Sequence, residues 1–317
     1  MTTSERRTVL KAALLAATAA APAAVPLMAR PAAAAGPSRD PLKPEPVPAQ
    51  VPVTEGFVEV PGGRLWYWDT GGGGTPVVLL HPGTGSDLAW PYQQPVLARD
   101  GHRVVAYSRR GHHRSSPATP QDQPAVADLL ALADHLELGR FHLVGAALGG
   151  FVAADFAVSH PRRLRSLALV NSQIGIQETE FRDALRRLQP PGADALPHSF
   201  RELGPSYRAA NPQGVHEWEE IVELSRPGPA SPFPKLTNRI TWDVLRTMRT
   251  RTLLTMGDAD LYIPPSLGRT VLEHLPNASS LTFAEVGHSP QWERPSVFNR
   301  KLLQFLRDAR FTDGTLV

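Results

Sequence analysis

The chain has 317 residues, of which 42% are hydrophobic and 20% charged, as expected for a globular protein with one sizeable core. The formal net charge is only +3 and basic residues are interleaved with acidic ones, which favours a solvated surface over a nucleic-acid-binding face. The lack of cysteine excludes disulfides, thiolate nucleophiles and thiolate metal sites.

The first 35 residues are typical of an export signal. In Ser4–Lys11, S-E-R-R-T-V-L-K, an arginine pair precedes apolar residues, which resembles the twin-arginine signal. The alanine- and leucine-rich segment 12–24 is too short and too weakly apolar for a permanent membrane anchor. Ala33–Ala35 offers the small residues that a signal peptidase accepts. We therefore expect a signal at 1–35 and export of a chain without a stable membrane anchor; the alternative is an amphipathic or disordered tail.

The remaining chain alternates between predicted strands and helices. The proline-rich segment 36–54 predicts an extended linker. Strands are expected at 57–60, 65–68, 77–80, 103–107, 141–144, 167–170, 252–256 and 280–283. Helices are expected at 91–98, 126–138, 267–274, 297–306 and from about 151 onward. This alternation predicts an α/β fold with a mostly parallel central sheet and helices on both faces.

The alternation of strands and helices breaks down between residues 173 and 239. Prolines, aromatic residues and charges cluster there, and two or three short helices are expected. We interpret 173–239 as a helical cap inserted into the sheet domain. The core of that domain then consists of 55–172 and 240–317.

A short segment in the middle of the chain carries the pattern of a reactive turn. In Leu143–Gly150, an apolar strand meets a glycine-flanked turn and a helix follows. This is the pattern of the nucleophile elbow G-x-S-x-G, in which a strained strand-to-helix turn presents a serine above a sheet. Here the pattern is Gly145-Ala146-Ala147-Leu148-Gly149. Ala147 therefore occupies the nucleophile position and is inert there.

Five motifs in sequence order resemble the α/β-hydrolase fold over residues 55 to 310. Besides the elbow, they are L-L-H-P-G-T-G at 79–85, Y-S-R-R-G-H-H-R-S at 107–115, G-D-A-D-L-Y-I-P at 257–264 and G-H-S-P-Q-W-E-R-P at 287–295. The chain is similar to the capped esterases, lactonases, cofactor-free haloperoxidases and carbon–carbon hydrolases of this superfamily.

The resemblance implies roles for particular residues. Asp260 matches the family acid and His288 the family base, in the order elbow, acid, histidine. Asp258 is the alternative acid, and Asp260 is preferred because the pattern places the acid three residues after a glycine and four before a proline. The implied oxyanion hole consists of the backbone N–H groups of Gly83 and Leu148.

Ala147 excludes ordinary acyl-enzyme chemistry, and three hypotheses remain. In the first, His288 oriented by Asp260 is a general base toward water or an acidic substrate proton, as in a hydrolase, lyase, cyclase or cofactor-free oxygenase. In the second, the protein is a pseudo-hydrolase that only binds a ligand. In the third, the natural residue is serine and Ala147 is an engineered knock-out.

The sequence also limits the partners of such a site. No metal-ligand cluster, phosphate-binding loop or dinucleotide fingerprint is visible, so we expect no cofactor. The expected substrate or ligand is a small, partly apolar molecule with a carbonyl group, such as an ester or lactone. No nucleic-acid partner is expected, and the oligomeric state stays open.

Overall fold

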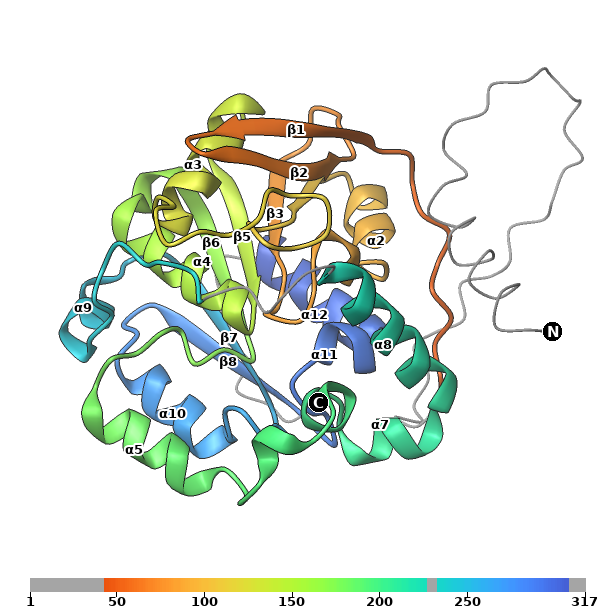
Figure 1. The fold of residues 1–317 in the computed structure, drawn as a ribbon, viewed down its shortest axis with the longest axis vertical. Helices are drawn as coiled ribbons and strands as arrows, with labels where there is room; N and C mark the ends of the chain where they lie inside the picture. The colour runs from red at the N-terminus through yellow and green to blue at the C-terminus, as the bar shows by residue number, and fades with distance from the viewer. Residues whose placement is uncertain (1–42, 227–232, 308–317) are drawn as a thin grey trace, which may run out of the picture. The chain divides into compact units, whose positions relative to one another are not determined.

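The structure is a computed structural model that describes residues 43–226 and 233–307 (Figure 1). The predicted export signal and the first part of the predicted linker lie outside the described residues. The remainder of that linker forms neither helix nor strand until β1 begins at Thr54. In the described part, no helix is both long and apolar enough to cross a membrane.

The described residues contain one eight-stranded sheet with the order β1-β2-β4-β3-β5-β6-β7-β8. Its strands are β1 (Thr54–Val60), β2 (Gly63–Asp69), β3 (Pro76–Leu80), β4 (Arg103–Tyr107), β5 (Phe141–Ala146), β6 (Leu164–Val170), β7 (Thr252–Gly257) and β8 (Ala278–Phe283). The pairs β1–β2 and β2–β4 are antiparallel, whereas all other pairs are parallel. The predicted α/β class with a mostly parallel sheet is confirmed.

Helices connect the strands and carry the chain from one to the next. They are α2 (Gln94–Arg99), α3 (Ala125–His135), α4 (Leu148–Ser159), α5 (Thr179–Leu188), α6 (His198–Glu202), α7 (Pro205–Ala210), α8 (Pro212–Ser225), α9 (Trp242–Thr247), α10 (Pro265–Glu273), α11 (Pro290–Glu293) and α12 (Pro295–Arg307). Short 3-10 turns are η1 (Asp87–Ala89), η2 (Pro161–Arg163) and η3 (Ala193–Ala195).

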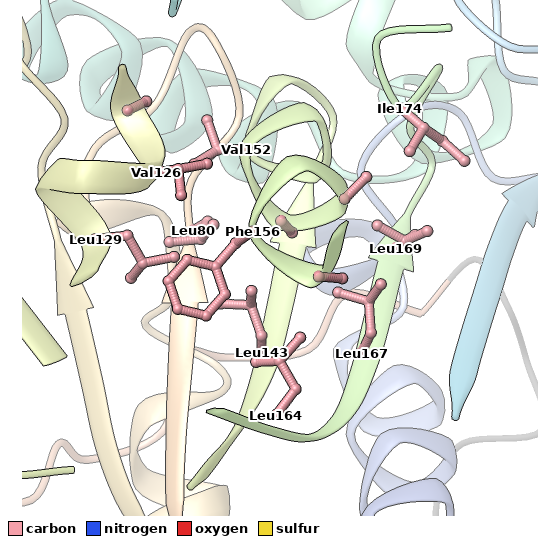
Figure 2. Close-up of a cluster of buried hydrophobic side chains, with 14 of the residues drawn as sticks. Leu80, Val126, Leu129, Leu143, Val152, Phe156, Leu164, Leu167, Leu169 and Ile174 are labelled. Atoms are coloured by element: carbon pink, nitrogen blue, oxygen red, sulfur yellow. The ribbon is translucent and has the colours of Figure 1, made fainter. Parts of the chain in front are cut away.

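Both faces of the central strands are buried. Leu143 of β5 packs in a cluster with α3, α4 and α10, whereas its neighbour Val144 packs in a second cluster with α2 and α12. Figure 2 shows part of the first cluster, with Phe156 of α4 beside Leu80 and Leu143. Because successive side chains point to opposite faces, burial of both faces requires continuous apolar strands.

The carboxyl ends of the parallel strands lie in register. Leu80, the last residue of β3, pairs with Tyr107 of β4 and Gly145 of β5, and Ala146 pairs with Val170 of β6. The loops that follow these strands therefore begin at one edge of the sheet, where ligands bind in open α/β folds.

The predicted cap segment (173–239) contains α5, η3, α6, α7 and α8, between β6 and β7. A parallel bridge joins Ile176 to Ile240, so the two ends of the segment lie side by side. Asp155 of α4 fixes the returning end, because its carboxylate accepts the N–H groups of Thr237 (2.7 Å) and Asn238 (2.9 Å). The domain boundaries themselves remain predictions.

We predict that Phe156→Ala lowers the free energy of unfolding by about 3–5 kcal/mol, because it removes a fully buried ring from the first cluster. Urea unfolding of the full chain measures this change. The matched control is Leu188→Ala on α5, whose side chain is 48% exposed; it should change the free energy by no more than about 0.5 kcal/mol. Equal effects of the two substitutions would contradict the packing described for Phe156.

Candidate active site

The strand-to-helix turn at Ala147 has a strained backbone. Ala147 has φ +48° and ψ −114°, which lies outside the regions that residues with a side chain ordinarily occupy. The surrounding glycines permit the turn: a Cβ on Gly145 would lie 2.6 Å from the Gly149 carbonyl oxygen, and a Cβ on Gly149 only 2.3 Å from the Leu80 carbonyl oxygen. The chain therefore makes a strained strand-to-helix turn at the predicted elbow, with the Ala147 methyl group at its apex.

His288 and Asp260 meet at the same edge of the sheet. His288 Nδ1 donates to Asp260 Oδ2 at 2.8 Å, since a carboxylate can only accept, which leaves Nε2 as the basic nitrogen. Asp260 is held in turn by the N–H of Tyr262 (2.7 Å) and the side-chain amide of Asn171 (3.2 Å). The alternative acid, Asp258, instead accepts the N–H of Glu285 at 2.6 Å.

The loop that follows β3, residues 81–85, is named the oxyanion loop after the oxyanion donor predicted at Gly83. The Pro82 carbonyl accepts hydrogen bonds from His81 Nδ1 (2.7 Å) and Arg109 Nη2 (3.0 Å). Because the peptide bond is trans, the N–H of Gly83 points away from this carbonyl. The N–H groups of Gly83 and Leu148 have no acceptor within the described part of the chain. Gly83 also lies next to Leu148, since a Cβ added to Gly83 would be 3.3 Å from Leu148 Cδ2.

The sequence profile of the alpha/beta hydrolase family matches residues 77–301, a span that includes every element of this site. The chain belongs to the alpha/beta hydrolase family. It is a member of a family of hydrolase-fold enzymes, as the motifs led us to expect.

Relatives of this chain include two named 2-hydroxy-6-oxononadienedioate/2-hydroxy-6-oxononatrienedioate hydrolases. The protein from Burkholderia vietnamiensis is 28% identical over 268 residues, covering 77% of this chain and 91% of the relative. The Pseudomonas putida protein is 31% identical over 271 residues, covering 77% and 92%. Among solved structures, a thermophilic esterase from Thermogutta terrifontis superposes with a TM-score of 0.68 at 25% identity, covering 81% of this chain and all of that one.

Three residues near His288 were not foreseen from the sequence. Tyr262 stacks on the His288 ring, with centroids 4.4 Å apart and an angle of 32° between the planes. Glu202 at the end of α6 lies beside the loop that carries His288, because its carbonyl accepts the His288 N–H at 2.8 Å. Glu293 of α11 accepts the N–H groups of Gly204 (2.7 Å) and Gly287 (3.1 Å). Tyr262 and Glu293 lie within the motifs at 257–264 and 287–295, but the sequence assigned them no role, whereas Glu202 lies in the cap segment outside all five motifs.

Three carboxyl groups determine the protonation of His288. Burial by itself lowers the pKa of His288, but the charges of Asp260, Glu202 and Glu293 oppose burial and raise the pKa above its ordinary value of 6.5. His288 is therefore a stronger base than free imidazole. Such a base can accept a proton from water, and the unpaired N–H groups of Gly83 and Leu148 can stabilise an oxyanion. The turn at Ala147 supplies no hydroxyl nucleophile.

One surface groove lies away from these residues. A surface groove of about 470 Å³ is lined by Phe151, Arg182, Phe233 and Arg239 among others, but not by Ala147, Asp260 or His288. Among the described residues, no group of three or more histidine, cysteine or acidic side chains is placed to hold a metal ion.

We predict a pH dependence of stability that originates at Glu293. Burial raises the pKa of this carboxyl from 4.5 to about 7, against the effect of its N–H donors. Because the folded chain then holds this proton more tightly than the unfolded chain, the free energy of unfolding should fall as the pH rises from about 4.5 to about 7. Glu293→Gln cannot titrate and should make this decline shallower in urea unfolding.

The control for that experiment is Glu285→Gln, which changes an exposed carboxyl in the preceding loop. It should leave the decline as in the parent. A Glu293→Gln protein with the same pH profile as the parent would show that Glu293 does not change its protonation on folding.

Proposed function

We propose that this hydrolase cleaves a small, partly apolar carbonyl compound, such as an ester or a lactone, by direct attack of water. Asp260 orients His288 as the general base, and the N–H groups of Gly83 and Leu148 stabilise the oxyanion. No acyl-enzyme forms. The observation that carries this proposal is the buried 2.8 Å hydrogen bond between His288 and Asp260 beside an elbow that has no hydroxyl.

In the proposed reaction, water takes the place of the missing serine hydroxyl above the Ala147 methyl group. His288 Nε2 accepts a proton as the water oxygen attacks the carbonyl carbon, and the carbonyl oxygen becomes negative. One backbone donor to such an oxyanion is worth about 3–4 kcal/mol. The tetrahedral intermediate then expels the leaving group, which takes the proton from the imidazolium and restores neutral His288.

The names of the relatives support hydrolysis, since they include an esterase and two hydrolases. Ala147 is the specific observation that favours the second candidate function, a pseudo-hydrolase that binds such a compound without turning it over. The same residue would also result from engineered replacement of a serine.

Two substitutions in the full chain separate these candidates, measured on a panel of activated esters and lactones with pre-steady-state sampling. If water attacks directly, the parent hydrolyses a substrate without a burst, and His288→Ala abolishes turnover while ligand binding remains. The parent rate should rise with pH through the raised pKa of His288, because only the neutral imidazole is a base.

The outcome for Ala147→Ser completes this test. A burst and a gain of several orders of magnitude over an inactive parent would show that the hydroxyl alone was missing, because loss of the serine costs about 10⁶-fold in a well-studied protease. Absence of turnover in both parent and Ala147→Ser, together with ligand binding, would favour the binding function.

We also propose that residues 1–35 direct export by the twin-arginine route. The support is the arginine pair Arg6-Arg7 before an apolar stretch. Replacement of both residues by lysine should retain the protein in the cytoplasm of the expressing cell, as cell fractionation would measure. Export of that variant in the same amount as the parent would contradict the proposed route.

A further inference from the structure

Glu202 connects two loops of the candidate site that are distant in sequence. Its carboxylate Oε2 accepts a hydrogen bond of 2.8 Å from Thr84 Oγ1 in the oxyanion loop. Its backbone carbonyl accepts the N–H of His288, also at 2.8 Å. The residue is only 4% exposed although it is acidic. A buried carboxyl is costly unless it interacts with donors or opposite charge, so this placement requires a physical explanation.

The backbone next to Glu202 fits closely against the histidine loop, residues 284–289. A Cβ on Gly287 would lie 2.6 Å from the N of Gly204 and 3.1 Å from the Glu202 carbonyl oxygen. A Cβ on Gly204 would lie 2.9 Å from the N of Gly287. Glycine on both sides permits this approach. The backbone of Glu202 is thus held against the histidine loop, and the Thr84 hydroxyl binds its carboxylate.

Charged groups from several elements face the two residues. Around His288 they are Asp260 after β7, Glu202 from α6 and Glu293 from α11. Around Glu202 they are Arg201, His288 and His198, whose Nδ1 lies 3.7 Å from Glu202 Oε1. Burial raises the pKa of Glu202, whereas His288 and the Thr84 hydroxyl lower it. The charge of an ionised Glu202 therefore favours the protonated form of His288, and the imidazolium in turn favours the ionised carboxyl.

We propose that Glu202 is a positioning residue of the active site, through which the cap segment fixes the loop of His288 and holds in place Thr84, the neighbour of the oxyanion donor Gly83. This inference rests on the proposed function, because it assigns a residue to the same site. A water nucleophile lacks the fixed position of a serine hydroxyl. The charge of this buried carboxyl group next to the histidine loop compensates in part, because a more basic imidazole removes the proton of water more readily.

The test measures the titration of the His288 ring by NMR in the full chain with labelled histidines, without any substrate. The signal of His288 is assigned by its absence in His288→Ala. In Glu202→Gln, which keeps the shape but not the charge, the titration midpoint of His288 should move to lower pH. The matched control is Glu223→Gln on α8, an exposed cap carboxyl, which should leave the midpoint unchanged.

A second pair of variants covers the case in which Glu202→Gln does not fold. Thr84→Val removes the hydroxyl that stabilises the ionised Glu202, and should also move the His288 midpoint to lower pH. Thr84→Ser restores the hydroxyl and should restore the midpoint. An unchanged midpoint in the folded Glu202→Gln protein, or in Thr84→Val if Glu202→Gln is unfolded, overturns the proposal.

The kinetic measurement distinguishes this proposal from the proposed function. Where the parent hydrolyses a substrate, the rising limb of kcat/KM against pH should move to lower pH in Glu202→Gln, and the plateau of kcat should fall. A protein without turnover would contradict the proposed hydrolysis but would still give the NMR result. A shift of neither the kinetic limb nor the NMR midpoint would leave Glu202 a structural residue of the cap segment.

Discussion

The hydrogen bond between His288 and Asp260 is the interaction on which the arrangement of the site depends. Asp260 is placed by the turn after β7, and His288 by the loop after β8, so the bond requires both loops to be fixed. Other elements of the chain supply that support. The carbonyl of Glu202 binds the His288 backbone, and Glu293 binds the adjacent Gly287. The acid–base pair is thus a product of the sheet edge and the cap segment together.

The strained turn at Ala147 is informative because its side chain contributes no chemistry. A residue with a side chain at φ +48° is costly unless the surroundings enforce it. The enforcement comes from the glycines of the elbow and from the hydrogen bond of 2.6 Å that Ser172 Oγ donates to the Ala147 carbonyl. The turn at Ala147 still orients the backbone N–H of Leu148, the first residue of α4. This geometry is useful to a site that stabilises an anion, whether or not a hydroxyl is present.

Much of the fold could be predicted from the sequence, and less of the site. The apolar runs of the central strands and the order of the motifs predicted the parallel sheet, because burial on both faces demands such runs. The short helices α9 and α11 were not predicted, since neither is long enough to show a helical period. Glu202 and Glu293 were also missed. Glu202 contacts segments far from it in the chain, such as Thr84, and a local pattern carries no signal of such contacts. Glu293 lies within a motif, but its contact with Gly204 depends equally on the fold.

The buried guanidinium of Arg109 has a consequence for the electronic character of the oxyanion loop. Burial lowers the pKa of Arg109 to about 10, so the group still carries its charge at neutral pH. That charge is directed at the carbonyl of Pro82, whose peptide nitrogen belongs to Gly83. A cation on the oxygen end of a peptide draws electrons through its resonance and makes the N–H end more positive, as in cooperative hydrogen-bond chains. The Gly83 N–H is therefore a stronger hydrogen-bond donor than that of a backbone amide without such a partner.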